Sequence, residues 1–325
     1  MKKLILFGGK GGTGKTTLAA ATSTFISRKY RTLVISFDVA HSLSDVFGIH
    51  IGPEVRMLKR NLYALEPDAE EVAKESSETL LSNLKNMLML TKVDRIFPEI
   101  GEMINFLDPK FLPISIKNSM FFEYVLQNED KYDIILADFP PTGSMFALLE
   151  IPETHLTKIL GTGVKMKKRP VLYYQVLSKL LSPSKILDGS SGLFREGFLK
   201  EAEALSRRAE RMLRRLSEAS LRLVTLPEKA SVEETYRSAR LSQHYANLDT
   251  IYINRVITED IAESTFLTKK KRLQDKYIDE LGKRFKDKLI IEVPDLSFEP
   301  CGLKNLEKLS LLIYENSIIN DTSFG

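Results

Sequence analysis

The chain has 325 residues, of which 43% are hydrophobic and 28% are charged, as expected for a globular protein. Its 47 basic and 43 acidic residues leave a net charge of +4, so the composition gives no indication of a nucleic-acid partner. One cysteine excludes an intrachain disulfide framework, and no apolar run reaches the length of a membrane span, so we expect a cytoplasmic protein.

The first predicted strand, residues 4–7, leads into a glycine-rich loop and then into a helical stretch over residues 17–29. The loop fits the G-x-x-x-x-G-K-[ST] phosphate loop, whose backbone N–H groups and helix N-terminus bind phosphate. Lys15 would contact the β- and γ-phosphates, and the Thr16 hydroxyl would bind Mg²⁺. The residues expected to contact nucleotide here are Gly9, Lys10, Gly11, Gly12, Thr13, Gly14, Lys15, Thr16 and Thr17. An ordinary glycine-rich turn would not require the lysine and threonine at this spacing.

Lys10 is a second lysine in this loop, at a position where a phosphate loop does not require one. Its side chain could reach a nucleotide bound by a partner subunit and stabilise charge during phosphoryl transfer, as an arginine finger does. The alternative is a solvated lysine without a catalytic role.

Two further apolar runs, residues 33–37 and 133–137, each precede an aspartate. Ligands of open α/β sheets collect beyond the carboxyl ends of the strands. Asp38 is therefore expected to position or deprotonate the attacking water, although an aspartate here could also cap the following turn. Asp138 is the expected magnesium partner of the phosphate loop. In the proline-rich loop that follows, Gly143 could sense a γ-phosphate through its N–H, as switch loops do.

Residues 68–125 and 155–220 differ in composition from the remainder and are predicted to form a helical insertion subdomain. Residues 1–67, 126–154 and 221–325 are assigned to a nucleotide-binding domain. The first insertion is rich in methionine and phenylalanine, which suits an apolar surface that adapts to varied partners, but a helical core would use the same residues. The second contains an arginine-rich helix that could dock on an anionic surface or simply be solvated.

The alternation of strands and helices resumes after the insertions. Strands are predicted at residues 221–225, 250–253 and 289–293, and a last helix at residues 303–315. Ser231 and Glu234 form a capping-box pattern that predicts a helix reaching Tyr245. Asn254 ends a strand with an amide that could both donate to and accept from adenine. The pattern indicates an α/β protein with a doubly wound, mainly parallel sheet.

With these residues the sequence resembles the ArsA-like ATPases, the family of the arsenite-pump ATPase and of the Get-pathway ATPase that targets tail-anchored membrane proteins. Residues 8–17 are similar to the family's deviant Walker A loop, residues 38–45 to its first switch and residues 138–143 to its second. The resemblance implies a P-loop NTPase of the SIMIBI type that binds ATP and Mg²⁺ as a homodimer. It also implies that Lys10 contacts nucleotide across the dimer and that Asp38 positions the hydrolytic water.

Other positions are assigned by the resemblance alone. Glu228, Asn254 and Pro294 lie in segments similar to those that contact ribose and adenine. Where zinc-bridged members have Cys-x-x-Cys, this chain has Ser264 and Leu267, which implies that no zinc site forms.

Two departures from the family pattern bear on function. After the second switch the family continues with histidine and then arginine, whereas Ser144 and Ala147 stand here, which leaves open how hydrolysis is coupled to the insertions. Cys301 is the only thiol, and capture of trivalent arsenic requires several.

The sequence therefore predicts a homodimeric, Mg²⁺-dependent ATPase that couples ATP binding and hydrolysis to the capture and release of a hydrophobic cargo. A tail-anchored membrane protein is the expected cargo, and a membrane receptor is a further candidate partner. The alternatives are an ATPase that drives an arsenite pump, a MinD/ParA-like ATPase that partitions on a surface, and a redox-regulated holdase.

Overall fold

The computed structural model describes residues 3–38, 42–67, 120–143, 145, 211, 214–243, 245–259 and 264–315. The chain divides into two compact units, of which the first comprises residues 1–69, 123–146 and 215–325 and the second residues 70–122 and 147–214. The sheet described below belongs to the first unit. The predicted helical insertions, with their methionine-rich segment and arginine-rich helix, fall largely outside the described residues, so their structure and cargo role stay predictions.

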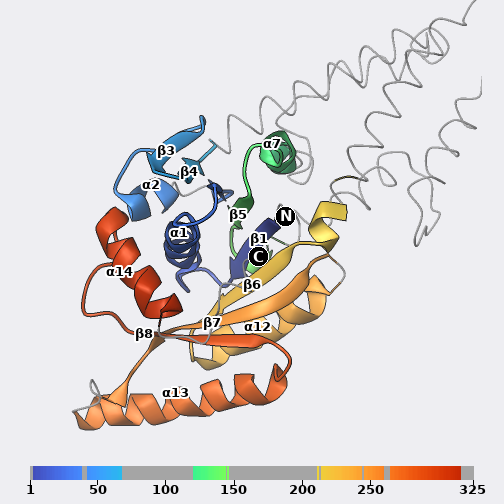
Figure 1. Cartoon of the computed structure of the whole chain (residues 1–325). Coiled ribbons are helices and arrows are strands. Elements are labelled where there is room, and N and C mark those ends of the chain that lie inside the picture. The colour runs from blue at the N-terminus through green and yellow to red at the C-terminus, as the bar shows by residue number, and fades with distance from the viewer. Residues whose placement is uncertain are drawn as a thin grey trace, which may run out of the picture. The chain divides into compact units, whose positions relative to one another are not determined.

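An eight-stranded sheet forms the centre of the first unit, in the order β3-β4-β2-β5-β1-β6-β7-β8 (Figure 1). The strands are β1 Lys3–Gly9, β2 Thr32–Ser36, β3 Arg56–Lys59, β4 Leu62–Leu65, β5 Ile134–Asp138, β6 Ser220–Thr225, β7 Asn247–Val256 and β8 Leu289–Pro294. Every neighbouring pair is parallel except β3 and β4. The predicted mainly parallel sheet is therefore confirmed.

Helices cover both faces of this sheet (Figure 1). They are α1 Lys15–Ile26, α2 Ser42–Phe47, α7 Met120–Asn128, α12 Lys229–Ser242, α13 Thr265–Arg284 and α14 Gly302–Tyr314. Helices α1, α2 and α14 pack together on one face, while α12 and α13 lie on the other. Alternate residues of the central strands, such as Ile5 and Phe7 of β1, are buried against the first group. None of the described helices has both the length and the apolarity that crossing a bilayer requires.

A chain of buried polar groups links α1 to the carboxyl-terminal helix. The hydroxyl groups of Thr22 on α1 and Tyr314 on α14 are hydrogen-bonded at 2.6 Å, and Tyr314 is hydrogen-bonded to Tyr252 of β7 at 2.7 Å. The guanidinium of Arg222 on β6 donates to the Tyr252 hydroxyl at 3.0 Å. Burial of such groups is tolerated because they are hydrogen-bonded to one another.

The edge strand β3 and its neighbour β4 were not predicted from the sequence. Each has only four residues, and β3 is half exposed, so neither forms a long apolar run. They form a hairpin whose turn contains Asn61 at φ +63°, a conformation that asparagine tolerates. The hairpin joins the sheet through parallel pairing of β4 with β2.

The capping box predicted at Ser231 and Glu234 is wrong. Helix α12 begins before Ser231, which lies inside it, and the helix ends at Ser242 rather than at Tyr245. The Ser231 hydroxyl instead accepts a hydrogen bond from the N–H of Leu226 at 3.0 Å. This bond satisfies a backbone donor just before α12, and the Glu234 carboxylate is left to contact another part of the chain.

Candidate nucleotide-binding site

The loop between β1 and α1 depends on glycine at two positions. At Gly9 the backbone has φ +147°, and a Cβ atom there would lie 2.2 Å from the carbonyl oxygen of Val224 on β6. At Gly14 φ is +91°, and a Cβ atom would lie 2.5 Å from the Nδ2 atom of Asn254. The contact at Gly9 is with backbone that cannot move aside, whereas at Gly14 the positive φ and the displacement of the Asn254 amide both disfavour a residue with a Cβ atom.

The carbonyl oxygen of Lys10 organises the interior of the loop. It accepts hydrogen bonds from the Thr13 hydroxyl at 2.8 Å and from the Lys15 ammonium at 3.3 Å. Lys15 is only 5% exposed, whereas Lys10 is exposed. Burial lowers the pKa of Lys15, while the charges of Asp138 and Asp38 act in the opposite direction. The Lys15 ammonium thus lies within the field of two carboxylates and rests on a loop carbonyl, from which it could move to a phosphate oxygen.

Thr16 and Asp138 meet at the start of α1. The Thr16 hydroxyl donates to Oδ2 of Asp138 at 2.6 Å, although the two residues are 122 positions apart in sequence. Oδ1 of Asp138 is buried and has no hydrogen-bond partner among the described residues. Burial raises the pKa of Asp138 to about 7, although the Thr16 hydrogen bond and the charge of Lys15 oppose that shift. A buried carboxylate oxygen without a partner, next to a hydroxyl, fits a divalent cation.

Asp38 reaches the same edge of the sheet. The register of β1, β2 and β5 aligns Phe7, Ser36 and Asp138 where these strands end. Asp38 follows β2 by two residues, and its N–H donates to the Ser36 hydroxyl at 3.3 Å. Its negative charge contributes to raising the pKa of Asp138. The structure therefore brings the two predicted aspartates together, while the role of Asp38 toward water stays a prediction.

Glu66 is a third carboxylate at this edge, and the sequence analysis missed it. It follows β4 directly, is 2% exposed and accepts hydrogen bonds from the N–H groups of Leu43 at 2.8 Å and Ser44 at 3.1 Å. The Ser44 hydroxyl donates to it as well. The carboxylate therefore fixes the first turn of α2, which lies within the predicted first switch, residues 38–45. The available signal was weak, because only the four residues of β4 precede this acid.

Replacing Glu66 by glutamine should lower the free energy of unfolding by about 1–3 kcal/mol, because the amide nitrogen would face donors that now bond to the carboxylate. Urea unfolding measures the change. Glu299→Gln is the matched control, since Glu299 is exposed. Equal stability of the two variants would contradict this role of Glu66.

The predicted switch loop is bound to α12. The Thr142 hydroxyl donates to Glu234 at 2.6 Å, and Arg237 forms an ion pair with the same carboxylate at 2.7 Å. The hydrogen bonds from Thr142 and Arg237, with a smaller contribution from the charge of Lys10, hold the pKa of Glu234 below its ordinary value. Glu234 thus binds the switch loop through Thr142 and lies close enough to Lys10 of the phosphate loop for that charge to affect its pKa. The capping-box prediction had instead assigned this side chain to the start of its own helix. Gly143 is exposed next to Thr142.

The residues assigned to the base and ribose lie beyond the strands on the other half of the sheet. Asn254 of β7 donates from Nδ2 to the carbonyl oxygen of Thr13 at 2.9 Å and accepts from the N–H of Arg255 at 3.0 Å. Its amide is therefore placed against the phosphate loop. Glu228 is exposed just before α12, and Pro294 ends β8. Asn254 and Pro294 lie in the carboxyl-terminal parts of β7 and β8, and Glu228 lies between β6 and α12. Their contacts with nucleotide stay predictions.

Ser264 and Leu267, which occupy the positions of the family's zinc cysteines, form the first turn of α13. The Ser264 hydroxyl caps the helix by accepting from the N–H of Leu267 at 3.2 Å. The described residues contain no group of three or more histidine, cysteine, aspartate or glutamate side chains that could hold a metal ion.

Comparison with known proteins places these features in a family. The sequence model of the anion-transporting ATPases, or ArsA ATPases, matches residues 2–315. A protein of Chlorobaculum tepidum named as an arsenical pump-driving ATPase is 28% identical over 98% of this chain and 76% of its own length. The ATPase GET3 of Komagataella phaffii is 28% identical over 96% of this chain and 90% of its own length.

A second arsenical pump-driving ATPase, from Aquifex aeolicus, is 29% identical over 95% of this chain and 98% of its own length. The relatives thus carry two kinds of name at similar identity, and all are named as ATPases. Their match spans the phosphate loop, both strand-end aspartates and the eight-stranded sheet. The chain belongs to the ArsA family of anion-transporting ATPases, and it is an ATP-hydrolysing enzyme with the P-loop NTPase fold.

Proposed function

We propose that this chain is a cytoplasmic, Mg²⁺-dependent ATPase that works as a homodimer and couples ATP binding and hydrolysis to the capture and release of a hydrophobic cargo, a tail-anchored membrane protein. The proposed binding and hydrolysis of ATP are supported by the contact of Thr16 with Asp138 beside the buried Lys15. The cargo part rests on the methionine- and phenylalanine-rich segment from Met87 to Phe122, most of which lies outside the described residues, and on the GET3 relatives.

Thr16 and Asp138 would hold the magnesium ion. The fit is supported by the buried Oδ1 atom of Asp138, which has no hydrogen-bond partner in the described part of the chain. When bound, the ion would neutralise charge on the phosphate oxygens. The chain itself would supply the Lys15 ammonium and the loop N–H groups to the β- and γ-phosphates, and Asp38 would orient water. Gly143 would approach the γ-phosphate from the switch loop.

Lys10 would act on the nucleotide of the opposite subunit. Its side chain is exposed while that of Lys15 is buried, and its carbonyl, rather than its ammonium group, contributes to its own loop. An exposed cation next to a phosphate site is available to a facing subunit, where it would stabilise charge in the transition state. Glu228, Asn254 and Pro294 would enclose ribose and adenine.

The test compares wild-type protein with Lys10→Ala by turnover, by particle mass and by co-purification of a tail-anchored segment. Lys10→Ala should lower turnover by about 100-fold, the usual effect of removing one transition-state donor. The wild type should have the mass of two chains with a non-hydrolysable ATP analogue and should retain the segment. Lys270→Ala, at an exposed position on α13, is the control and should behave as wild type.

Unchanged turnover in Lys10→Ala, with single-chain mass in every nucleotide state, would refute the dimer. Absence of the segment in every nucleotide state would refute the cargo. Stimulation of hydrolysis by arsenite would favour the second candidate, a pump-driving ATPase, to which the names of several relatives point. Against that candidate stands Cys301, the chain's one thiol, which donates to the carbonyl oxygen of Asp45 at 3.0 Å.

A further inference from the structure

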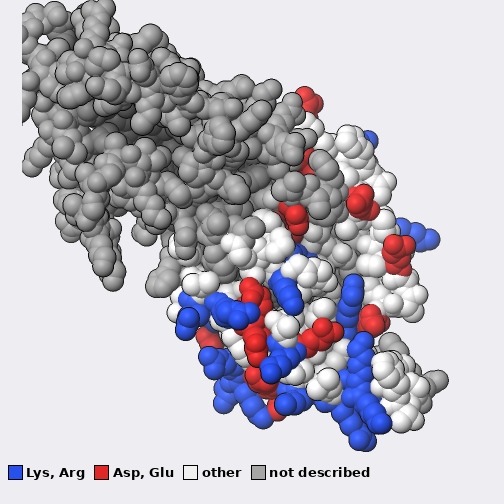
Figure 2. All heavy atoms as spheres, turned by 180° about the vertical axis from the view of Figure 1, so that it is seen from behind, with Lys and Arg blue, Asp and Glu red and all other residues white. Residues whose placement is uncertain are grey.

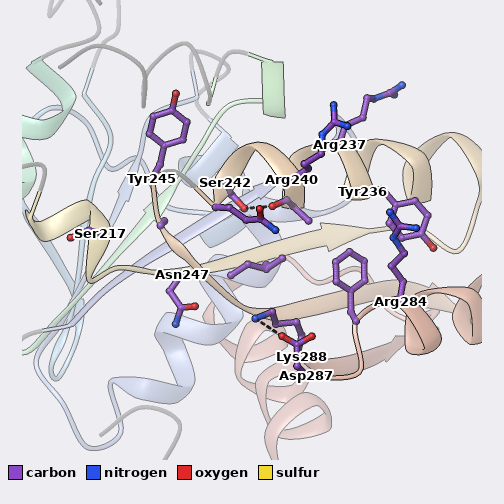
Figure 3. Close-up of a pocket in the computed structure, with 15 residues that line it drawn as sticks. Ser217, Tyr236, Arg237, Arg240, Ser242, Tyr245, Asn247, Arg284, Asp287 and Lys288 are labelled. Carbon is purple, nitrogen blue, oxygen red and sulfur yellow. Dashed lines mark hydrogen bonds and ion pairs between the residues drawn. The ribbon is translucent and has the colours of Figure 1, made fainter. Parts of the chain in front are cut away.

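A cavity of about 740 Å³ lies at the edge of the sheet opposite the phosphate loop (Figure 3). It opens beside the amino ends of β7 and β8, between the last turns of α12 and the segment that follows α13. The phosphate loop follows the carboxyl end of β1, and β1, β6, β7 and β8 are parallel. The cavity is therefore separate from the nucleotide site, and the proposed ATPase cycle does not use it.

The lining of this cavity, here called the basic groove, carries an excess of positive charge. Its cations are Arg237, Arg240, Arg284 and Lys288, and its one acidic residue is Asp287. Figure 3 shows that the first two project from α12 and the last two come from the end of α13 and the loop after it. On the face seen in Figure 2, lysine and arginine lie beside aspartate and glutamate over the described residues.

Two of the four cations have a carboxylate partner. Lys288 pairs with Asp287 at 2.9 Å, and Arg237 pairs with Glu234 outside the groove. No described carboxylate forms an ion pair with Arg240 or Arg284. Arginine presents five donors in a fork that matches a carboxylate, so these two side chains retain most of their binding capacity.

Aromatic rings supply an apolar wall next to these cations. The guanidinium of Arg284 lies 4.9 Å from the ring centroid of Tyr236, and the rings of Tyr236 and Phe285 lie 5.6 Å apart. Tyr245 and Leu248 extend the apolar part of the lining. Stacking of this kind fixes the guanidinium plane and reduces the entropy lost when a ligand binds.

Stabilisation of the helix ends accounts for only part of this arrangement. A cation in the last turn of α12 and another in the last turn of α13 each offset the negative end of a helix dipole. One cation per helix would achieve this. It does not explain why both helix ends, an aromatic wall and a further arginine converge on one cavity.

We propose that the basic groove binds an acidic segment of a partner protein in which aspartate or glutamate residues are interspersed with large apolar ones. Arg240 and Arg284 bind its carboxylates, and the wall of Tyr236 and Phe285 packs against its apolar side chains. A densely charged phosphate group fits less well, because phosphate sites use helix N-termini and clustered N–H groups, whereas α12 and α13 present their carbonyl ends here.

The test uses a fluorescein-labelled peptide of about 12 residues that alternates Glu or Asp with Leu or Phe, a length suited to a surface groove. Anisotropy is measured against the full chain and against two variants with equal charge change. Arg240→Glu/Arg284→Glu should weaken binding by about tenfold or more, whereas Lys270→Glu/Arg272→Glu, at exposed positions outside the groove, should change it by less than about twofold.

Each other outcome overturns the proposal. No binding to the wild type, or equal weakening in both variants, would mean that the groove is not specific for the segment. Displacement by inorganic tripolyphosphate at concentrations below those of the peptide would assign the groove to phosphate. Thermal melting and basal ATP hydrolysis should be the same in both variants; if the glutamate variant unfolds, Arg240→Gln/Arg284→Gln replaces it, with the same expected loss of binding.

Discussion

Lys15→Ala is expected to reduce ATP hydrolysis by at least about 100-fold, because it removes a preorganised cation from the phosphate loop. The Lys15 ammonium is buried, rests on the carbonyl oxygen of Lys10 at 3.3 Å and lies within the field of Asp38 and Asp138. Its ammonium is thus held in the loop before nucleotide binds, and we expect it to need only a short movement to reach a phosphate oxygen. No other described lysine is buried beside Thr16 and Asp138.

The measurement is the rate of phosphate release at saturating ATP, together with nucleotide affinity from a separate titration. Lys270→Ala, on the exposed side of α13, serves as the control and should retain wild-type turnover. Lys15→Arg should also lower turnover, since a planar guanidinium does not replace a compact ammonium at this buried position. Retention of more than about a tenth of the activity by Lys15→Ala would show that another group supplies the charge.

Gly9→Ala is expected to cost about 3–5 kcal/mol of unfolding free energy, or to prevent folding. The added Cβ atom would lie 2.2 Å from the Val224 carbonyl oxygen, and that oxygen belongs to a strand paired with β1. The backbone of Val224 cannot move away from the new Cβ atom as a flexible side chain could. The positive φ of +147° adds strain for any residue with a Cβ atom.

Urea unfolding with circular dichroism measures this loss, and two other glycines give graded controls. Gly282→Ala in α13 has nothing within 4 Å of the new Cβ atom and should be neutral or stabilising by up to about 1 kcal/mol. Gly12→Ala has the same open space but φ +78°, so it should show backbone strain alone. If Gly9→Ala were as stable as Gly282→Ala, the clash at β6 would be excluded.

The phosphate loop could be predicted from the sequence because its residues are adjacent in the chain. The phosphate loop is a contiguous run from Gly9 to Thr17, and its strand and helix flank it directly. Asp38 and Asp138 could be predicted as site residues because the carboxyl ends of parallel strands lie at the same edge of the sheet. The position of Asp138 beside the phosphate loop followed from topology, and the structure places its carboxylate 2.6 Å from the Thr16 hydroxyl.

The parts that could not be predicted depend on contacts between distant segments or on short strands. Glu66 was missed because the strand before it, β4, has only four residues and lies next to the edge of the sheet, so no long apolar run marks it in the sequence. The contact of Thr142 with Glu234 spans 92 residues, and a local capping pattern offered a competing explanation for that glutamate. The hydrogen bond of Asn254 to Thr13 spans 241 residues.

The polar chain that runs from Thr22 through Tyr314 and Tyr252 to Arg222 connects the end of α14 to α1. Thr22 lies on α1, whose first residues are predicted to contact phosphate, and the phenol of Tyr314 supports that helix through a hydrogen bond. A chain shortened by one turn of α14 would strip Thr22 and Tyr252 of a shared buried partner. We expect such a change to loosen the packing of α1, more than 290 positions away in sequence, and so to weaken the predicted binding of ATP.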